Sequence, residues 1–254
     1  MRIGIRDGCL GLAAMESFAA AAELGFDGIE VCIGGDYAES LLWQEGGAEQ
    51  MKAAADAAGV AVSSLSPGIF ARQHPMVEDP ALRAEGRAML GQCIALCGPL
   101  ASRDILVPMF PGDFETWGDA EWAQMADGFA DLAAQAEDAG VTLGLETTFD
   151  ADSLIKLLDL IASPAVGVYY DTANTTNRGY DAPAELRKLG DRVSMIHVKD
   201  TDQQHLGEGR VPFDDIKAAI ANIRYDGWLI LETPRGDDPI DSARRNLAFT
   251  RTLC

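Results

Sequence analysis

The chain has 254 residues, 48% of them hydrophobic, and no run comes near the about 18 apolar residues that a membrane-spanning helix needs. Its formal charge of −20 at pH 7 disfavours nucleic acid as a partner, because phosphate backbones are bound by basic surfaces. The first residues, Met1 to Ile5, are typical of a strand and lack the features of a signal peptide, so we expect a cytoplasmic globular protein without a membrane partner.

Short hydrophobic runs alternate with alanine-rich amphipathic segments along the whole chain. A short apolar run bounded by turn residues is typical of a buried parallel strand. Eight such runs predict strands at Arg2–Arg6, Gly28–Ile33, Val60–Ser66, Asp104–Met109, Val141–Glu146, Val166–Asp171, Val193–Lys199 and Trp228–Glu232. The segments between them predict helices, among them Ala13–Leu24, Ala48–Ala58, Leu82–Cys97 and Ala120–Ala139.

Glycine directly follows three of these helices, at Gly25, Gly59 and Gly140, where a left-handed residue commonly ends a helix. Strands that alternate with helices indicate βαβ units and a parallel sheet. Eight such units in a chain of this length favour a closed barrel over an open doubly wound sheet. We therefore predict the α/β class, with one (β/α)8 TIM barrel domain over residues 1–254.

Four consecutive predicted strands in the second half end at or lead into a residue that can bind a divalent cation: Glu146, Asp171, His197 and Glu232. Taken singly, such an acid is more often a helix N-cap or an ion-pair partner, and a histidine like His197 is more often a hydrogen-bonded core residue. In a parallel barrel, however, these strand ends meet on one face. Carboxylates are costly to leave unpaired beside an apolar core, and this donor set suits a hard or borderline cation. The set predicts a metal-dependent enzyme.

A resemblance to a known family rests on the segments Leu24–Glu30, Tyr170–Asn174, Ile196–Asp200, Leu206–Gly209 and Tyr225–Glu232. With these segments the chain resembles, over essentially its whole length, the xylose isomerase-like TIM barrels. This superfamily of sugar (phosphate) isomerases and epimerases also contains endonuclease IV.

The resemblance implies one divalent cation, Mn²⁺, Mg²⁺ or Co²⁺ with Zn²⁺ as a further candidate, held by Glu146, Asp171, His197 and Glu232. It also implies that Glu146 and Glu232 transfer protons on opposite faces of a ketose or related keto-sugar. The expected function is a metal-dependent isomerase or epimerase that works through a cis-enediolate, in which the cation acts as Lewis acid.

Five further residues are candidates for binding the sugar. The epimerases usually carry histidine where this chain has Asn174, which can hydrogen-bond a hydroxyl but bears no charge. Lys199 belongs to the family's His-x-Lys-Asp run, His205 and Arg210 flank a glycine-rich loop, and Trp117 follows the fourth strand with Phe110 and Phe114.

Other functions remain open on the sequence. An inosose-dehydratase-like lyase begins with the same proton abstraction and then expels hydroxide. An endonuclease IV-like nuclease would need a basic groove and more than the three histidines present. A non-catalytic barrel subunit would not need all four candidate ligands. The expected partner is a small-molecule sugar, and exposed helical faces of barrels often pair, so a homo-oligomer is a further expectation.

Overall fold

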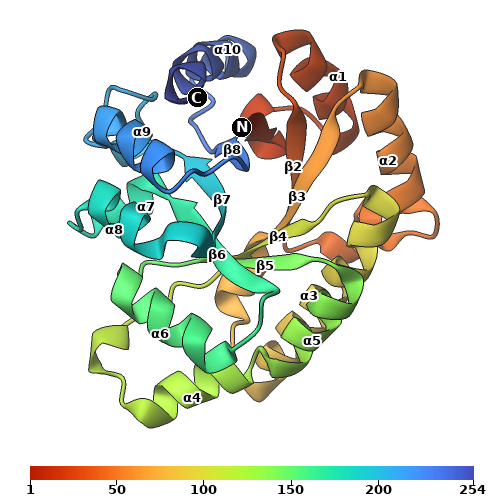
Figure 1. Ribbon diagram of the computed structural model, residues 1–254. Helices are drawn as coiled ribbons and strands as arrows, with labels where there is room; N and C mark the ends of the chain where they lie inside the picture. Colours follow the sequence, from red (N-terminus) through yellow and green to blue (C-terminus); the bar gives the residue numbers. More distant parts are fainter.

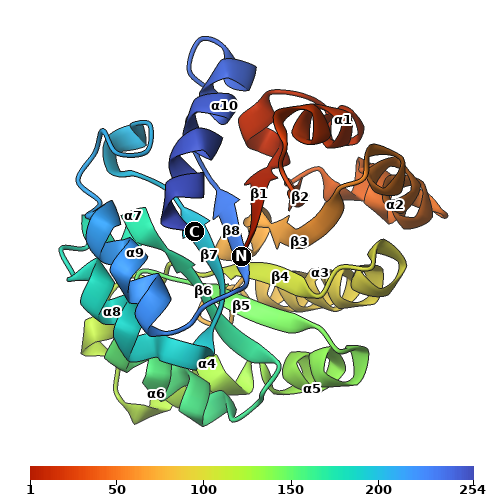
Figure 2. The same cartoon turned by 45° about the horizontal axis from the view of Figure 1, so that its top comes forward.

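The computed structural model describes residues 1–254 and contains eight parallel strands that close into a barrel, as predicted (Figure 1). Every strand pairs with its neighbours in sequence, and β1 pairs with β8 to close the circle (Figure 2). The strands are β1 (Arg2–Arg6), β2 (Gly28–Ile33), β3 (Ala61–Pro67), β4 (Asp104–Pro108), β5 (Thr142–Glu146), β6 (Val166–Asp171), β7 (Val193–Val198) and β8 (Trp228–Leu231).

The helices form a ring around the strands (Figure 1). They are α1 (Ala14–Leu24), α2 (Gly47–Ala58), α3 (Pro80–Leu100), α4 (Asp119–Asp127), α5 (Ala130–Ala139), α6 (Ala151–Ile161), α7 (Thr172–Asn177), α8 (Ala182–Leu189), α9 (Phe213–Asn222) and α10 (Pro239–Thr250). The predicted glycine caps are confirmed, because Gly25, Gly59 and Gly140 end their helices with φ of 88°, 75° and 64°. None of the helices combines the length and the apolar character that crossing a bilayer requires.

The prediction of one helix over Ala120–Ala139 is wrong. The segment forms two helices, α4 and α5, that are interrupted at Gly128 and Phe129. Pro75, from the loop after β3, packs against this point: a Cβ atom on Gly128 would lie 2.4 Å from the Pro75 ring, and Gln124 donates a hydrogen bond to the Pro75 carbonyl at 3.2 Å. The break is therefore associated with a segment about 50 residues away in sequence, which helical periodicity does not reveal.

The buried hydrophobic residues form two clusters, one between the barrel and the surrounding helices and one inside the barrel. Because side chains alternate along a strand, every second residue points into the barrel and the others point toward the helices. A cluster of 66 buried residues contains the helix-facing strand residues together with the helix faces that cover them. A second cluster joins residues of four strands: Leu106, Tyr169, Met195, Trp228 and Ile230.

The lower part of the barrel is filled so tightly that glycine is required at Gly28. A Cβ atom there would lie 2.7 Å from the Trp228 ring and 2.9 Å from the carbonyl oxygen of Ala61. The indole of Trp228 therefore occupies space that any side chain on β2 at this level would need. Toward the carboxyl ends of the strands, polar residues replace this apolar filling.

We expect Gly28→Ala to lower the free energy of unfolding by about 1–3 kcal/mol, the usual cost of adding a group to a packed core. Gly112→Ala is the matched control, because a Cβ atom at Gly112 meets nothing within 4 Å. It should change the stability by less than about 0.5 kcal/mol. Urea unfolding followed by circular dichroism measures both; equal stability of the two variants would contradict this packing around Gly28.

Candidate metal centre

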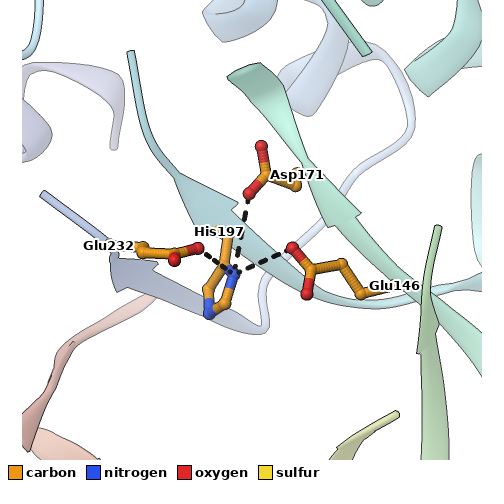
Figure 3. A group of neighbouring side chains, drawn as sticks. All are labelled: Glu146, Asp171, His197 and Glu232. Carbon is orange, nitrogen blue, oxygen red and sulfur yellow. Dashed lines mark ion pairs between the residues drawn. The ribbon is translucent and has the colours of Figure 1, made fainter. Parts of the chain in front are cut away.

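The carboxyl ends of four adjacent strands bring Glu146, Asp171, His197 and Glu232 together (Figure 3). Glu146 ends β5, Asp171 ends β6, His197 lies in β7 and Glu232 directly follows β8. Asp171 and His197 are paired in the register of β6 and β7. One donor atom from each residue lies within 4.8 Å of every other. The predicted convergence is therefore present in the fold.

The three carboxylates surround a single nitrogen of the imidazole. The distances from His197 Nδ1 are 3.2 Å to Glu232 Oε2, 3.6 Å to Glu146 Oε1 and 3.8 Å to Asp171 Oδ2. Figure 3 shows all three carboxylates turned toward this nitrogen. A cation between these atoms would have three anionic oxygens and one nitrogen as ligands, a donor set that suits Mn²⁺ or a similar divalent ion.

Two of these donor atoms form no hydrogen bond in the protein. Asp171 Oδ2 and His197 Nδ1 are buried and accept or donate no hydrogen bond. Buried polar atoms without a partner are rare and destabilising, so each needs an explanation. A divalent cation at this point would satisfy both, and the residues present therefore fit such an ion.

The charges of the cluster also favour a cation. Burial and the negative charge of Glu146 raise the pKa of Asp171 to about 7. Burial opposes a charge on His197, but the nearby carboxylates of Glu30, Glu146 and Glu232 outweigh it and raise the pKa of His197 well above its usual value. The protein alone thus attracts protons to this point, and a divalent cation can supply that positive charge instead.

The other nitrogen of His197 is held by a carboxylate inside the barrel. His197 Nε2 lies 3.1 Å from Glu30 Oε1, and neither side chain is exposed. Glu30 Oε2 accepts hydrogen bonds from Ser64 Oγ at 2.8 Å and Tyr169 Oη at 2.6 Å. An ionised Glu30 accepts the Nε2 proton, which leaves the lone pair on Nδ1 directed at the centre, as in metal sites whose histidine is oriented by an outer carboxylate.

Asn174 contacts two of the four candidate ligands. Its side-chain nitrogen donates to Glu146 Oε1 at 3.0 Å, and its backbone N–H donates to Asp171 Oδ1 at 2.7 Å. The second bond makes Asp171 the N-cap of α7. Asn174 therefore orients both carboxylates without adding a charge to the centre.

Glu232, in contrast, lies between two cations. Arg6 Nη1 donates to Glu232 Oε1 at 2.5 Å, and Lys199 Nζ lies 3.2 Å from Glu232 Oε2. Burial would raise the pKa of Glu232, but the contact with His197 and the positive charges of Arg6 and Lys199 lower it. The two glutamates thus differ in their surroundings, a neutral amide at Glu146 and two cations at Glu232.

A cavity of about 400 Å³ opens onto the centre, and Glu146, Asn174, Lys199 and Glu232 all line it. Part of its wall is apolar and includes Leu106, Pro108 and the half-exposed ring of Phe110. Asp171 and His197 do not line this cavity; they lie beneath it, 3% and 0% exposed.

Three of the residues predicted to bind sugar lie elsewhere. Trp117 packs edge-on against Trp122 and Phe149, with ring centres 5.0 and 5.9 Å apart. His205 Nδ1 lies 3.1 Å from Asn246 Nδ2, and Arg210 donates to Asn177 Oδ1 at 2.8 Å. None of the three lines a cavity at the centre.

Sequence reasoning missed Glu30 as a site residue. A signal for Glu30 was available, since it is the only charged residue of its otherwise apolar strand, Gly28–Ile33. A buried charge requires a partner. The sequence could not show that this partner is His197, which is 167 residues away in the chain.

Comparisons with known proteins agree with the fold. The sequence profile of the family described as xylose isomerase-like TIM barrel matches residues 18–253. The chain is 25% identical over 253 residues to a fructoselysine 3-epimerase of Shigella flexneri, a match that covers 93% of this chain and 92% of that protein. It is 25% identical over 178 residues to an inosose dehydratase of Bacillus thuringiensis (strain Al Hakam), which covers 57% of this chain and 58% of the dehydratase.

Among solved structures, a D-allulose 3-epimerase from Methylomonas sp. in complex with D-allulose superposes with a TM-score of 0.85. The superposition covers 100% of this chain and 97% of that one at 19% sequence identity. At this identity the comparison establishes the fold alone.

We expect Asp171→Asn to weaken binding of Mn²⁺ by more than the about 10–100-fold that loss of an outer partner typically causes. The amide keeps the size and the N-cap oxygen of Asp171 but removes the charge. Asp152→Asn, on the exposed start of α6, is the matched control and should bind Mn²⁺ like the unaltered protein. Calorimetric titration measures both, and equal affinities would remove Asp171 from the site.

Glu30→Gln should reduce Mn²⁺ affinity by about 10–100-fold, because His197 loses the charged acceptor that fixes its proton on Nε2. Ser64→Ala removes one donor to Glu30 but leaves the contact with His197, so its effect should be smaller. The same titration, with circular dichroism to confirm folding, checks this order. A folded Glu30→Gln variant with unchanged affinity would show that Glu30 does not orient the ligand.

Proposed function

The chain belongs to the xylose isomerase-like TIM barrel family, and on this premise we propose that it is a metal-dependent epimerase or isomerase of a ketose or related keto-sugar. The proposal is supported by the buried Glu–Asp–His–Glu cluster. It is also supported by the similarity to a fructoselysine 3-epimerase, which extends over almost the whole chain. The reaction proposed is removal of a carbon-bound proton beside a carbonyl, through a cis-enediolate.

One observation carries the proposal: of the four candidate ligands, only Glu146 and Glu232 reach the cavity. Their side chains are 8% and 22% exposed, whereas those of Asp171 and His197 are 1% and 0% exposed. A group that takes a proton from a substrate carbon has to touch it. The two buried ligands can only hold a cation, and the two glutamates can in addition exchange protons with a sugar.

The protein residues would share the reaction as follows. A divalent cation held by the four residues would polarise the ketose carbonyl and the neighbouring hydroxyl. One glutamate removes the proton from the carbon next to the carbonyl, and the electron pair moves into the enediolate. The other glutamate returns a proton to the opposite face of that carbon, which inverts it. Return of the proton to the adjacent carbon isomerises the sugar instead.

Lys199 and Arg6 would assist by position and charge. Both line the cavity, and both contact Glu232. Positive groups fixed in place before the reaction stabilise negative charge that develops on substrate oxygens. The arrangement suits an enediolate, in which negative charge moves from a carbon onto oxygen.

An inosose-dehydratase-like lyase is the second candidate, because inosose dehydratases also match part of the chain. The match to the Bacillus thuringiensis dehydratase covers 57% of this chain, whereas the match to the fructoselysine 3-epimerase covers 93%. This difference favours the epimerase. Products from a panel of keto-sugars distinguish the two, because a dehydratase releases water and an epimerase gives an isomer of equal mass.

Glu146→Gln and Glu232→Gln should each lower turnover by about 10²–10⁴-fold, the usual contribution of general acid–base catalysis. The amide keeps the size and one coordinating oxygen, so Mn²⁺ occupancy should fall far less than in Asp171→Asn. In D₂O, the variant that retains the proton-abstracting glutamate should still exchange the substrate's carbon-bound proton without forming product, which proton NMR detects.

Glu49→Gln on the outer helix α2 is the matched control and should leave turnover unchanged. Near-normal turnover in either active-site variant would exclude that glutamate from proton transfer and leave it as a ligand only.

A further inference from the structure

A second cavity of about 330 Å³ lies beside the first and shares Arg6, Lys199 and Glu232 with it. The rest of its wall comes from β2 and from the loops after β1, β7 and β8, and it includes Gln203 and Arg235. Since Glu232 lines both cavities, a ligand whose reacting carbon meets Glu232 can extend from the first cavity into the second.

Arg235 is the cation of this cavity that no carboxylate neutralises. Arg6 and Lys199 both contact Glu232, whereas Arg235 forms no ion pair and only donates from Nε to the carbonyl of Gly8 at 2.6 Å. A guanidinium carries five N–H donors, so most of those of Arg235 remain available. In a chain with 40 acidic and 20 basic residues, this unpaired cation beside the centre suits an anion supplied by a ligand.

Asp200, an acid in the same wall, is fully used in holding a loop. Its Oδ1 accepts the backbone N–H groups of Thr201 and Val211 at 2.8 and 3.2 Å. Its Oδ2 accepts those of Gly207 and Gly209 at 2.9 and 3.0 Å. Four accepted bonds use all the sites of a carboxylate, so Asp200 has none left for a ligand.

The loop that Asp200 holds presents Gln203 to the cavity in a strained conformation. Asp202 and Gln203 are consecutive residues with φ of 57° and 56°, in the left-handed region that non-glycine residues rarely adopt. Such strain persists only where the surrounding structure enforces it, and it gathers at ligand-binding sites. The Gln203 side chain lines the cavity and forms no hydrogen bond within the protein.

We propose that this cavity binds a compact anionic group of the substrate, a phosphate or a carboxylate, between Arg235 and Gln203. The inference rests on the proposed function in one respect, that the substrate is a ketose. Arginine binds both groups through paired, charge-assisted hydrogen bonds, and the Gln203 amide can add a neutral donor. Arg235 and Gln203 would thus bind the substrate, as the sequence suggested for His205 and Arg210. The side chains of His205 and Arg210 instead form hydrogen bonds with Asn246 and Asn177.

The test compares three ligands that share one carbon skeleton: D-fructose, D-fructose 6-phosphate and D-fructuronate, each titrated calorimetrically into the Mn²⁺-loaded protein. At least one of the two anions should bind about tenfold or more tightly than D-fructose, as expected for charge-assisted hydrogen bonds. The tighter anion shows whether the site takes a phosphate or a carboxylate. Arg235→Met should bring the ratio of affinities to about one, and Gln203→Ala should reduce it partly.

Arg244→Met, which removes an exposed charge from nearby α10, is the matched control and should keep the full preference. The inference is overturned if D-fructose binds as tightly as both anions, or if Arg235→Met retains the preference. Proton exchange in D₂O is measured on the same samples. If the anions bind more tightly than D-fructose in a way that depends on Arg235, but no carbon-bound proton exchanges, the proposed function is refuted and the anion site stands. If a carbon-bound proton exchanges but the anions bind no more tightly than D-fructose, the anion site is refuted and the proposed function stands.

Discussion

The structure depends on how the barrel accommodates one buried charge, that of Glu30. A carboxylate removed from water costs several kcal/mol unless it is paired and hydrogen-bonded. Glu30 is 0% exposed and meets partners from four other strands: Arg6 of β1, Ser64 of β3, Tyr169 of β6 and His197 of β7. Although burial opposes its ionisation, His197 and the other partners lower the pKa of Glu30. The strands around Glu30 are thus tied together at the level just below the candidate centre.

This pairing connects the packing of the barrel to its chemistry. His197 is held through Nε2 by Glu30, and its Nδ1 is left among three carboxylates. Arg6 also contacts both the buried carboxylate and the candidate centre, because its Nε lies 3.2 Å from Glu30 and its Nη1 donates to Glu232. Arg6 and His197 therefore link the buried carboxylate to the candidate metal centre above it.

The surroundings of the two accessible glutamates are unequal. Glu146 faces the neutral amide of Asn174 and shares its cavity with the apolar wall that includes Phe110. Glu232 lies between Arg6 and Lys199 and opens in addition toward Arg235 and Gln203. A substrate placed across the centre would meet an apolar surface on one side and polar, cationic groups on the other.

The sequence by itself determined the strands, the barrel and the four candidate ligands, because these depend on local patterns. Apolar runs and glycine caps mark the elements, and parallel strands necessarily place Glu146, Asp171, His197 and Glu232 on one face. Only the tertiary structure decided which residues meet across the closed barrel, since Glu30 and His197 are 167 positions apart and Arg6 and Glu232 are 226 apart. It also decided the conformation of the loops. The packing of Pro75 divides α4 from α5, and the backbone held by Asp200 brings Gln203, rather than His205 or Arg210, to the cavity. Pattern shows which face of a strand a side chain occupies, but barrel closure and loop conformation select its partner.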